Sequence, residues 1–591
     1  MPRSLRPKFA AIAAMSFLAV SVCGCTSLSD YVRNGFKVGP NYCPPKAPVA
    51  EHWIDAARIP QTADTETWRH WWTVFNDPKL NELIECAYRQ NLTLREAGYR
   101  VLQARATLAI ARGDLFPQSQ TASGSYTRSE ASLNPPAGGS GGSRFSNQWN
   151  TGFNLQWELD FWGQFRRAIA SADASLDASV YGYDAALVTM LGDIAKNYVQ
   201  VRTDQERIRL LQYNVEHVQT AVWERAMARS GRDPKTGKKQ PGGSTVIESD
   251  ADVAESTMKQ TQATITQVVI DQRQAENQLC ILMGMPPVDL ARFLDGGPIP
   301  QAPVEVAIGI PADLVRRRPD VRQAERLAAA QAEQIGISQA ALYPAIYVNG
   351  TLGYQAAAFP NLFTNEAFRG SLGPSFQWNV LNYGRIVNSV RFQDATFQLL
   401  VVTYQQTVLQ AAGEAEDGLV AFLQSQQRAK YLYDAVQAQA KAVSSARTRY
   451  LQGGIAGQGE ASFTTYTLYE QNLLNAQDLS AQAQGQIAQA LIVVYRALGG
   501  GWEIRLGGNQ PAPAMPAVAP GAPNGSEPVP APIPAPPGAL QQPGVLQQPD
   551  EPQEVMDVSR EPALSSRRVA AAQEAPNGLK FEEIVPRSPN L

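Results

Sequence analysis

The chain has 591 residues and a formal net charge of −3, with 51 Lys and Arg against 54 Asp and Glu. This balance gives no electrostatic reason to expect a nucleic acid as partner, and the hydrophobic share of 44% is ordinary for a folded chain. The histidines His52, His70 and His217 are scattered, and the sequence has no nucleophile elbow and no phosphate-binding loop. These observations argue against an enzyme and against a cofactor or metal site.

The N-terminus predicts export and lipidation. Three basic residues precede an apolar run over residues 9–22, which is typical of a secretory signal and too short to span a bilayer. The run ends in Val22–Cys25, which resembles a bacterial lipobox, so we expect Cys25 to carry diacylglycerol and a fatty acyl chain such as palmitate. Cys23 is a competing acceptor, and secretion with Cys25 unmodified is the plain alternative. Thr26 follows Cys25 and favours an outer-membrane address.

The first half of the chain predicts a short helix followed by two strands. Asp77 is typical of an N-cap for a helix over 78–113, with Pro78 at the first helical position. Residues 118–128 predict a weak strand rich in Ser and Thr. Residues 148–159 predict a clear strand, because mostly apolar residues at odd positions alternate with polar residues or glycine at even positions.

Two very long helices follow the strand-like segments. Residues 164–230 contain no proline and predict a helix of 67 residues, about 100 Å long at about 1.5 Å per residue. Residues 385–452 predict a second such rod, of 68 residues. Each rod ends at a Gly-rich break, and a helix of about 40 residues follows each break, over 245–283 and 462–498. Such Ala-rich rods need lateral partners along their length.

The second half repeats the plan of the first. A short helix over 311–342 precedes strand-like residues over 346–354 and 368–380, and Gln156, Trp157 and Gly163 match Gln377, Trp378 and Gly384. We therefore divide the chain into a signal peptide (1–24), a first repeat (25–300), a second repeat (301–506) and a tail (507–591). The tail is rich in Pro, Gln and Ala, which predicts disorder. The isolated Cys43, Cys86 and Cys280 predict packing roles.

Four strands are too few for a closed membrane barrel. The apolar face of the strands would meet a second sheet in a soluble sandwich or lipid in an outer-membrane barrel, and the pattern alone does not separate the two. In a membrane, a sheet of four strands has two open edges, and the unpaired backbone N–H and C=O groups there find no water to bond with. Copies of the chain must therefore associate. A dimer would supply eight strands and a trimer twelve; because about eight strands enclose only side chains, a conducting tube favours the trimer.

Six ordered motifs carry a family resemblance. The chain resembles the trimeric outer-membrane efflux channels of Gram-negative bacteria, in the lipoprotein branch paired with resistance-nodulation-division pumps. The resemblance covers Cys25 to about Leu506 and implies a mixed fold of α-helices and membrane β-strands, in which a 12-stranded β-barrel continues into a periplasmic α-helical barrel. It further implies a passive exit duct that works with a periplasmic adaptor (membrane fusion) protein and an inner-membrane pump. The motifs are 38–42 (VGPNY), 75–80 (FNDPKL), 157–163 (WELDFWG), 282–284 (LMG), 316–321 (RRRPDV) and 497–502 (ALGGGW).

In this family the breaks after the rods form the periplasmic tip, which docks the adaptor and narrows to a gate. The resemblance therefore implies docking near the ends of the rods, at Arg229, Gly231, Arg449, Tyr450, Gly453 and Gly454. Tyr450 and Gly453 match the family best, whereas an insertion over 233–243 and a lengthened second break depart from it.

Acidic residues beyond the breaks are candidates for the gate. Asp250, Asp252 and Glu460 would form charged rings in a symmetric channel, although acids at a helix start are also stabilised there without any gating role. The basic run Arg316–Arg318 suggests an anion site, but local pairing with Asp313, Asp320 and Glu325 is the better interpretation.

Two other functions stay open at this stage. A duct for type I protein secretion would share the fold, and a non-conducting lipoprotein could brace the envelope with its rods. A non-conducting brace does not require strands with one apolar and one polar face, whereas a membrane channel does, so the strands favour the channel. The transported substrate is chosen by the pump, and the sequence does not identify it.

Overall fold

The computed structural model describes residues 28–50, 52–54, 66–131, 144–233, 235–236, 238, 248–294, 296–303, 316–452 and 463–506. The chain divides into two units, Met1–Met515 and Pro516–Leu591, and all described residues belong to the first. The predicted signal peptide, Cys25 and the tail after residue 506 lie outside them. Among the described residues, no helix is both long and apolar enough to cross a membrane.

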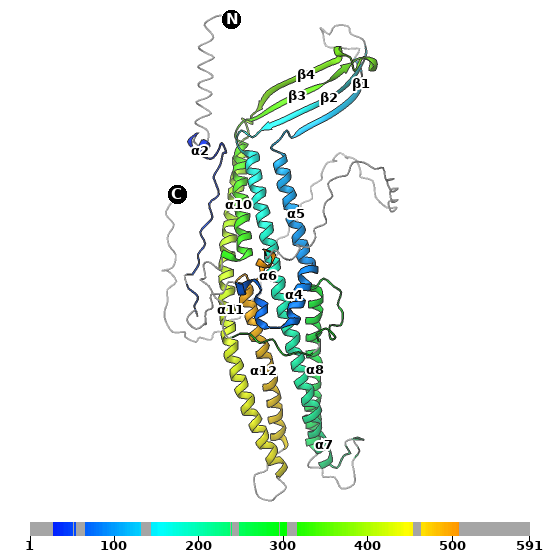
Figure 1. The fold of residues 1–591 in the computed structure, drawn as a ribbon, viewed down its shortest axis with the longest axis vertical. Coiled ribbons are helices and arrows are strands. Elements are labelled where there is room, and N and C mark those ends of the chain that lie inside the picture. The colour runs from blue at the N-terminus through cyan, green and yellow to red at the C-terminus, as the bar shows by residue number, and fades with distance from the viewer. Residues whose placement is uncertain are drawn as a thin grey trace, which may run out of the picture. The chain divides into compact units, whose positions relative to one another are not determined.

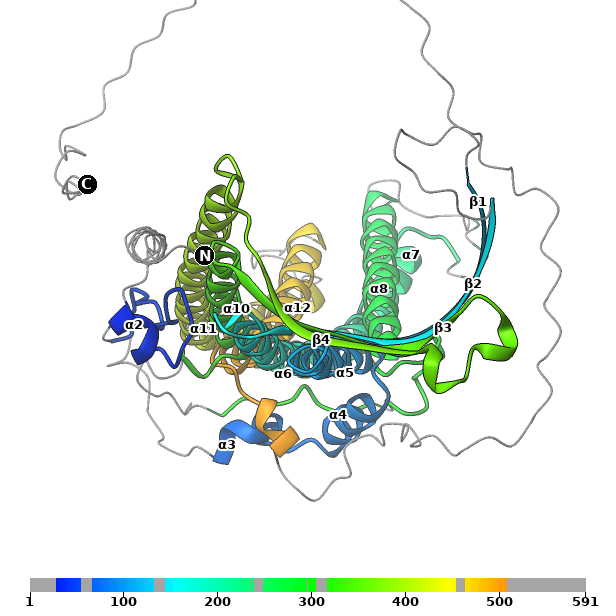
Figure 2. The ribbon, with the colours of Figure 1, turned by 90° about the horizontal axis from the view of Figure 1, so that it is seen from above.

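The four predicted strands form one antiparallel sheet in the order β1-β2-β3-β4 (Figure 1). Strands β1 (Ser119–Glu130) and β2 (Phe145–Leu159) come from the first half, and β3 (Ala345–Ala356) and β4 (Phe368–Gln377) come from the second. The two hairpins join through the β2–β3 pair, and the sheet is a curved strip when seen from above (Figure 2). In the part of the chain that the structure describes, β1 and β4 each have one strand neighbour.

A row of four helices continues the four strands. Helix α5 (Leu92–Gly113) leads into β1, α6 (Gln164–Tyr213) follows β2, α10 (Pro319–Ala340) leads into β3, and α11 (Arg385–Gln452) follows β4. The contacts α5–α6, α6–α10 and α10–α11 place these helices in the same order as the strands (Figure 1). The predicted mixed fold, with duplicated halves, is therefore confirmed.

The second rod is continuous and the first is interrupted. Helix α11 contains all 68 predicted residues. In the first rod, a π-helical segment over Asn214–Gln219 separates α6 from α7 (Thr220–Arg229), so the prediction of one regular helix is wrong there. The hydroxyl of Thr220 donates to the carbonyl of Val215 five residues earlier, at 2.7 Å, which supports the wider turn. Each rod is followed by a helix of 35 residues, α8 (Glu248–Leu282) and α12 (Phe463–Ala497).

The first short helix is broken in two. Helix α4 (Pro78–Gln90) ends at Asn91, whose ψ of 125° is not helical, and α5 begins at the next residue. The Asn91 side chain accepts from the Leu94 amide at 2.8 Å and donates to the Leu282 carbonyl at 2.7 Å. Asn91 thus caps α5 and ties it to the end of α8, a tertiary contact that the local sequence pattern does not reveal. Helix α10 begins at Pro319 rather than at 311, and residues 311–315 are outside the described part.

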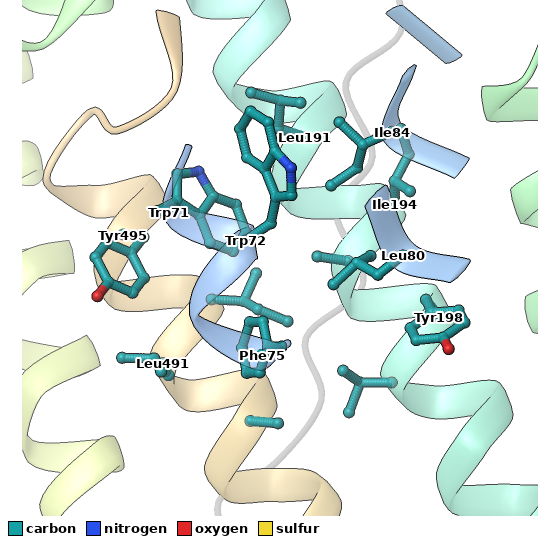
Figure 3. Close-up of a cluster of buried hydrophobic side chains, with 14 of the residues drawn as sticks. Trp71, Trp72, Phe75, Leu80, Ile84, Leu191, Ile194, Tyr198, Leu491 and Tyr495 are labelled. Carbon is teal, nitrogen blue, oxygen red and sulfur yellow. The ribbon is translucent and has the colours of Figure 1, made fainter. Parts of the chain in front are cut away.

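The main hydrophobic core lies where α4 and the short 3-10 helix Trp71–Phe75 meet α6 and α12 (Figure 3). Trp71, in the short 3-10 helix Trp71–Phe75, stacks on Tyr495 with ring centroids 5.4 Å apart. Asp77 caps α4 as predicted, accepting from the amides of Lys79 and Leu80, and its other oxygen accepts from the Tyr198 hydroxyl at 2.6 Å. One carboxylate therefore starts a helix and fixes it to the rod.

The isolated cysteines differ in their surroundings. Cys280 is buried in the main core, in agreement with a packing role. Cys86 is half-buried at the edge of this core. Cys43 is exposed, so the prediction of a packing role is wrong for it, because the segment that carries it lies on the surface of the helices rather than between them.

Candidate functional site

The sheet has one apolar face and one polar face across all four strands. Residues paired directly across an antiparallel sheet share a face, and the register pairs Phe153 with Leu352 and Gly350 with Leu372. The apolar face carries Tyr126, Trp149, Phe153, Leu155, Trp157, Ile346, Val348, Leu352, Tyr354, Phe368, Leu372 and Phe376. The polar face carries Ser123, Asn150, Asn154, Gln156, Glu158, Asn349, Thr351, Gln355, Arg369, Ser371, Ser375 and Gln377.

Among the described residues, much of the apolar face is exposed, most strongly on β4. Leu372 is 76% exposed and Phe376 is 75% exposed. Exposed apolar surface of this extent, backed by a polar face, is typical of strands that separate lipid from water. The predicted strand residues Trp378 and Val380 lie beyond the end of β4, which is at Gln377.

Apolar side chains are also exposed on the two outer helices of the row. On α11 they lie at intervals of seven, three and seven residues, at Phe392, Leu399, Val402 and Leu409. This is the a/d spacing of helices that pack side by side. On α5, at the other end of the row, Leu92, Tyr99 and Ile110 are exposed. Both ends of the row therefore present surfaces suited to a further helix.

Residues 34–39 are held against the junction of the sheet and the helices. The guanidinium of Arg167, at the start of α6, is fully buried and donates to the carbonyls of Val38 and Gly39 at 2.6 and 2.8 Å and to Glu333 of α10 at 2.7 Å. Arg166 donates to the carbonyls of Gly35 and Phe36, both at 2.7 Å. The N-terminal segment is thus fixed close to the ends of the strands.

The first predicted tip is a capped helix end. Gly231 has a φ of 72°, its amide donates to the Ala228 carbonyl at 3.3 Å, and the Arg232 amide donates to the Met227 carbonyl at 3.0 Å. This is a Schellman motif, which requires the left-handed conformation that glycine adopts without strain. Arg232 also pairs with the exposed Asp252 of α8 at 3.4 Å.

The second predicted tip packs against the first through aromatic rings. Tyr450, near the end of α11, stacks on Tyr466 of α12 with centroids 5.6 Å apart and contacts Phe463 at 5.8 Å. Phe463 is buried among Ala226, Met227, Ala251 and Ala254 of α7 and α8. The ends of the two rods are therefore in contact within one chain.

The predicted tip and gate residues have different surroundings. Tyr450 is a packing residue, Arg449 is exposed, and Asp252 has an arginine partner. Asp250 is half-buried near the start of α8. Arg229 is the last residue of α7. Gly453, Gly454 and Glu460 lie outside the described residues. The proposed docking and gating roles of these residues stay predictions.

A layer of polar side chains lies beside the π-helical segment Asn214–Gln219, closer to the sheet than the tips are. The buried Gln219 donates to the hydroxyl of Thr261 at 2.9 Å, and the hydroxyl of Tyr466 donates to Glu470 at 2.8 Å. Gln219 and Glu470 line a small cavity between α8 and α12. Sequence reasoning missed this layer, although polar residues at the inner positions of paired helices are a signal for it.

The carboxyl of Glu470 gives the tip a predicted pH dependence. Burial raises its pKa, while the Tyr466 hydroxyl and Arg447 lower it by less. The folded chain therefore binds a proton more tightly than the unfolded chain, so acidification through the raised pKa stabilises the tip, and ionisation at neutral pH costs stability. We expect the gain in thermal midpoint between about pH 7 and about pH 5 to be smaller in Glu470→Gln than in the wild type. Glu255→Gln, at an exposed position of α8, is the control, and an unchanged pH dependence in Glu470→Gln would contradict the assignment.

The basic run before α10 is structural, and one of its predicted partners is wrong. Arg318 is buried and donates to Asp320 at 2.7 Å, to Glu414 of α11 at 2.8 Å and to the Ala497 carbonyl at 2.9 Å. Arg317 pairs with Glu503 at 2.5 Å. The predicted pairing with Asp320 is present. Glu325 instead pairs with Arg326, because it lies about two turns, or about 10 Å, along α10 from Arg318, and Asp313 is outside the described residues.

Comparisons with known proteins agree with these surfaces. A family model described as outer membrane efflux protein matches residues 83–231 and 310–500, more than half of the chain. Nodulation protein T of Rhizobium leguminosarum bv. viciae is 30% identical over 400 residues, covering 65% of this chain and 75% of that protein. The probable efflux pump outer membrane protein TtgC of Pseudomonas putida is 27% identical over 482 residues, covering 80% and 95%.

Solved structures show the same fold. The outer-membrane channel OprN matches with a TM-score of 0.70 and 28% identity, covering 79% of this chain and 99% of that one. The MtrE outer membrane channel of Neisseria gonorrhoeae matches with a TM-score of 0.67 at 24% identity, covering 79% and 98%.

A two-faced sheet continued by a row of long helices defines an outer-membrane channel. The chain belongs to the outer membrane efflux protein family. It is a transport protein rather than an enzyme, and it is the outer-membrane channel component of an efflux pump.

Proposed function

We propose that three copies of this chain close into one passive exit duct, with the polar face of the sheet towards the conduit. The observation that carries the proposal is the matched order of strands and helices, which ends in β1 and α5 on one side and in β4 and α11 on the other. The two sides differ, so contact between copies would be head-to-tail, and contacts of this kind form a ring when the rotation between copies closes. Three copies supply twelve strands, enough for a conducting interior.

The side surfaces of the chain support this closure. Unpaired backbone groups of β1 in one copy would bond to those of β4 in the next, which removes both open edges from lipid. The exposed apolar stripe of α11 would pack beside α5 of the next copy, in the same direction around the ring. The curvature of the sheet is the form that a segment of a barrel needs (Figure 2).

The partners in this proposal are a periplasmic adaptor protein and an inner-membrane pump of the resistance-nodulation-division type. The adaptor would dock at the helix ends around Gly231 and Arg449, and acids such as Asp250 and Asp252 would narrow the entrance. The relatives include proteins named for toluene, solvent, antibiotic and pyoverdine export, so small organic molecules are the proposed cargo.

A lipid anchor at Cys25 is the proposed attachment of the N-terminus. Helix α2 begins at Leu28, three positions after Cys25, and Tyr31 of α2 donates to the carbonyl of Phe161 beside the end of β2 at 2.6 Å. An acyl chain at Cys25 would therefore start near the edge of the membrane that the strands enter. Mass spectrometry of the mature N-terminus tests this, and an unmodified Cys25 would refute it.

We also propose the division of the chain into repeats over 25–300 and 301–506, followed by the tail. Glycines with left-handed backbones precede both rods, Gly163 with a φ of 83° and Gly384 with a φ of 80°. The recurrence of this left-handed glycine at matching positions, directly before each rod, supports duplication of one ancestral unit.

Single-channel recording in planar bilayers tests the duct, together with the mass of the native assembly. We expect stepwise currents from a trimer, and larger currents after removal of the helical tips below the polar layer. Absence of current, whatever the mass of the assembly, would refute the duct. Conduction by a dimer would refute the twelve-stranded barrel. Family membership favours this duct over the envelope brace.

A further inference from the structure

A cavity of about 330 Å³ lies at the foot of the polar face, where the strands meet the helices. Polar side chains from both halves line it: Glu158, Asp160, Gln164, Tyr347, Gln377 and Asn379. The register places Glu158 directly opposite Tyr347, and both lie on the polar face of the sheet. The cavity therefore opens on the side that the proposed channel turns towards its conduit.

The cavity is acidic and only one of its carboxylates is neutralised. Asp160 accepts from Arg166 at 2.8 Å and from the amides of Phe165 and Arg166, both at 3.0 Å, so its charge is used at the start of α6. No lysine or arginine is among the residues that line the cavity, and no ion pair to Glu158 exists among the described residues. Glu158 accepts a hydrogen bond from the Tyr347 hydroxyl, and in the described part of the chain it has no cationic partner to balance its charge.

Aromatic side chains complete the lining. Phe165, Trp162 and Tyr343 border the cavity together with Tyr347. Trp162 and Tyr343 stack on each other with ring centroids 4.5 Å apart, so one face of each is occupied, whereas Phe165 and Tyr347 stack on no other ring of the described residues. Rings beside a carboxylate attract cations through their electron-rich faces, and alkylated ammonium groups gain most because they shed water easily. The amide oxygens of Gln164 and Gln377 can accept hydrogen bonds from an ammonium that keeps N–H groups, and their partial negative charge favours a fully alkylated one.

We propose that this cavity is a binding site for an organic cation that carries an ammonium group, occupied transiently during passage through the channel. The volume matches a small organic molecule and is far larger than a bare metal ion needs. One carboxylate without an ion-pair partner suits one positive charge, and an anion would meet repulsion. The inference rests on the proposed function, because only the channel brings cargo to the polar face; in a trimer, three such sites surround the conduit.

Block of single-channel potassium chloride current by tetraethylammonium tests the site in the full-length protein. We expect a voltage-dependent block of the wild type, and in Glu158→Gln a dissociation constant for the blocker that is on the order of tenfold higher. Glu158→Asp should recover part of the affinity, which a merely structural role would not explain. Glu130→Gln is the matched control. Glu130 lies in β1, at the end of the sheet away from Glu158, and pairs with Arg144 at 2.5 Å.

The possible outcomes separate this proposal from the channel itself. Absence of current in the wild type would refute the duct. Current with equal block in the wild type and Glu158→Gln would overturn the cation site alone. Block that is relieved by Asp252→Asn but not by Glu158→Gln would place cation binding at the tip and would likewise overturn the proposal. Each variant should keep the mass of the trimer and the circular dichroism spectrum of the wild type, which excludes misfolding as the cause of any change in block.

Discussion

Replacing Leu372 by Arg is expected to prevent assembly in the outer membrane. Leu372 is the fifth of ten residues in β4, so it lies near the middle of the membrane, on the apolar face. An arginine on the lipid face near the midplane costs about 2–4 kcal/mol in each copy, or about 6–12 kcal/mol for a trimer. That is comparable to the whole stability of many folded proteins. Separation of membrane fractions followed by native gels should show loss of the assembled form.

The neighbouring residue supplies a matched control. Ser371 lies on the polar face, where Arg369 already occupies a position two residues away. Ser371→Arg loses one contact, the 2.6 Å hydrogen bond between the hydroxyls of Ser371 and Thr351, and is expected to assemble as the wild type does. Its added positive charge should lower the conductance for cations. Equal assembly of the two variants would contradict the placement of Leu372 against lipid, and failure of Ser371→Arg alone would mean that the two faces have been assigned the wrong way round.

Replacing Arg167 by Met is expected to cost about 3–5 kcal/mol of folding free energy. Met fills a similar volume, but it leaves Glu333 without its partner at a site where the carboxylate is only 15% exposed, and it leaves the Val38 and Gly39 carbonyls without their donor. We expect a lower midpoint of thermal unfolding, measured by circular dichroism. Proteases should also release residues 28–50 at temperatures where the wild type resists them.

A surface arginine on the same helix provides the comparison for Arg167. Arg209 pairs with Glu206 at 2.7 Å, and its side chain is 66% exposed. Arg209→Met should therefore change stability by less than about 1 kcal/mol. A thermal midpoint of Arg167→Met equal to that of Arg209→Met would show that the buried arginine does not hold the N-terminal segment.

The helices and strands were largely predictable, because their signals are local. Odd and even positions of 148–159 alternate in polarity, and the structure places them on opposite faces of β2. The absence of proline over 385–452 corresponds to one helix with those bounds. The break at Asn91 and the π-helical segment at Asn214–Gln219 were not predictable, because contacts with α8, distant in sequence, stabilise them.

The candidate site was predicted unevenly for the same reason. Tyr450 was identified at the tip, but only the packed structure gives it Tyr466 and Phe463 as neighbours. Glu158 and Asp160 belong to the same motif 157–163, yet only the structure shows that Arg166 pairs with Asp160. Charge compensation depends on distances between side chains, and a motif does not contain those distances.

The sequence by itself determined the duplicated plan and the two-faced strands, and it led to the expectation that several copies associate, because these follow from periodicity, proline placement and the number of strands. Only the tertiary structure decided the order β1-β2-β3-β4, the matching helix row and the cavity beside Glu158. These depend on which surfaces of distant segments pack together, and many pairings are compatible with one hydrophobic pattern until backbone hydrogen bonds and side-chain packing select one of them.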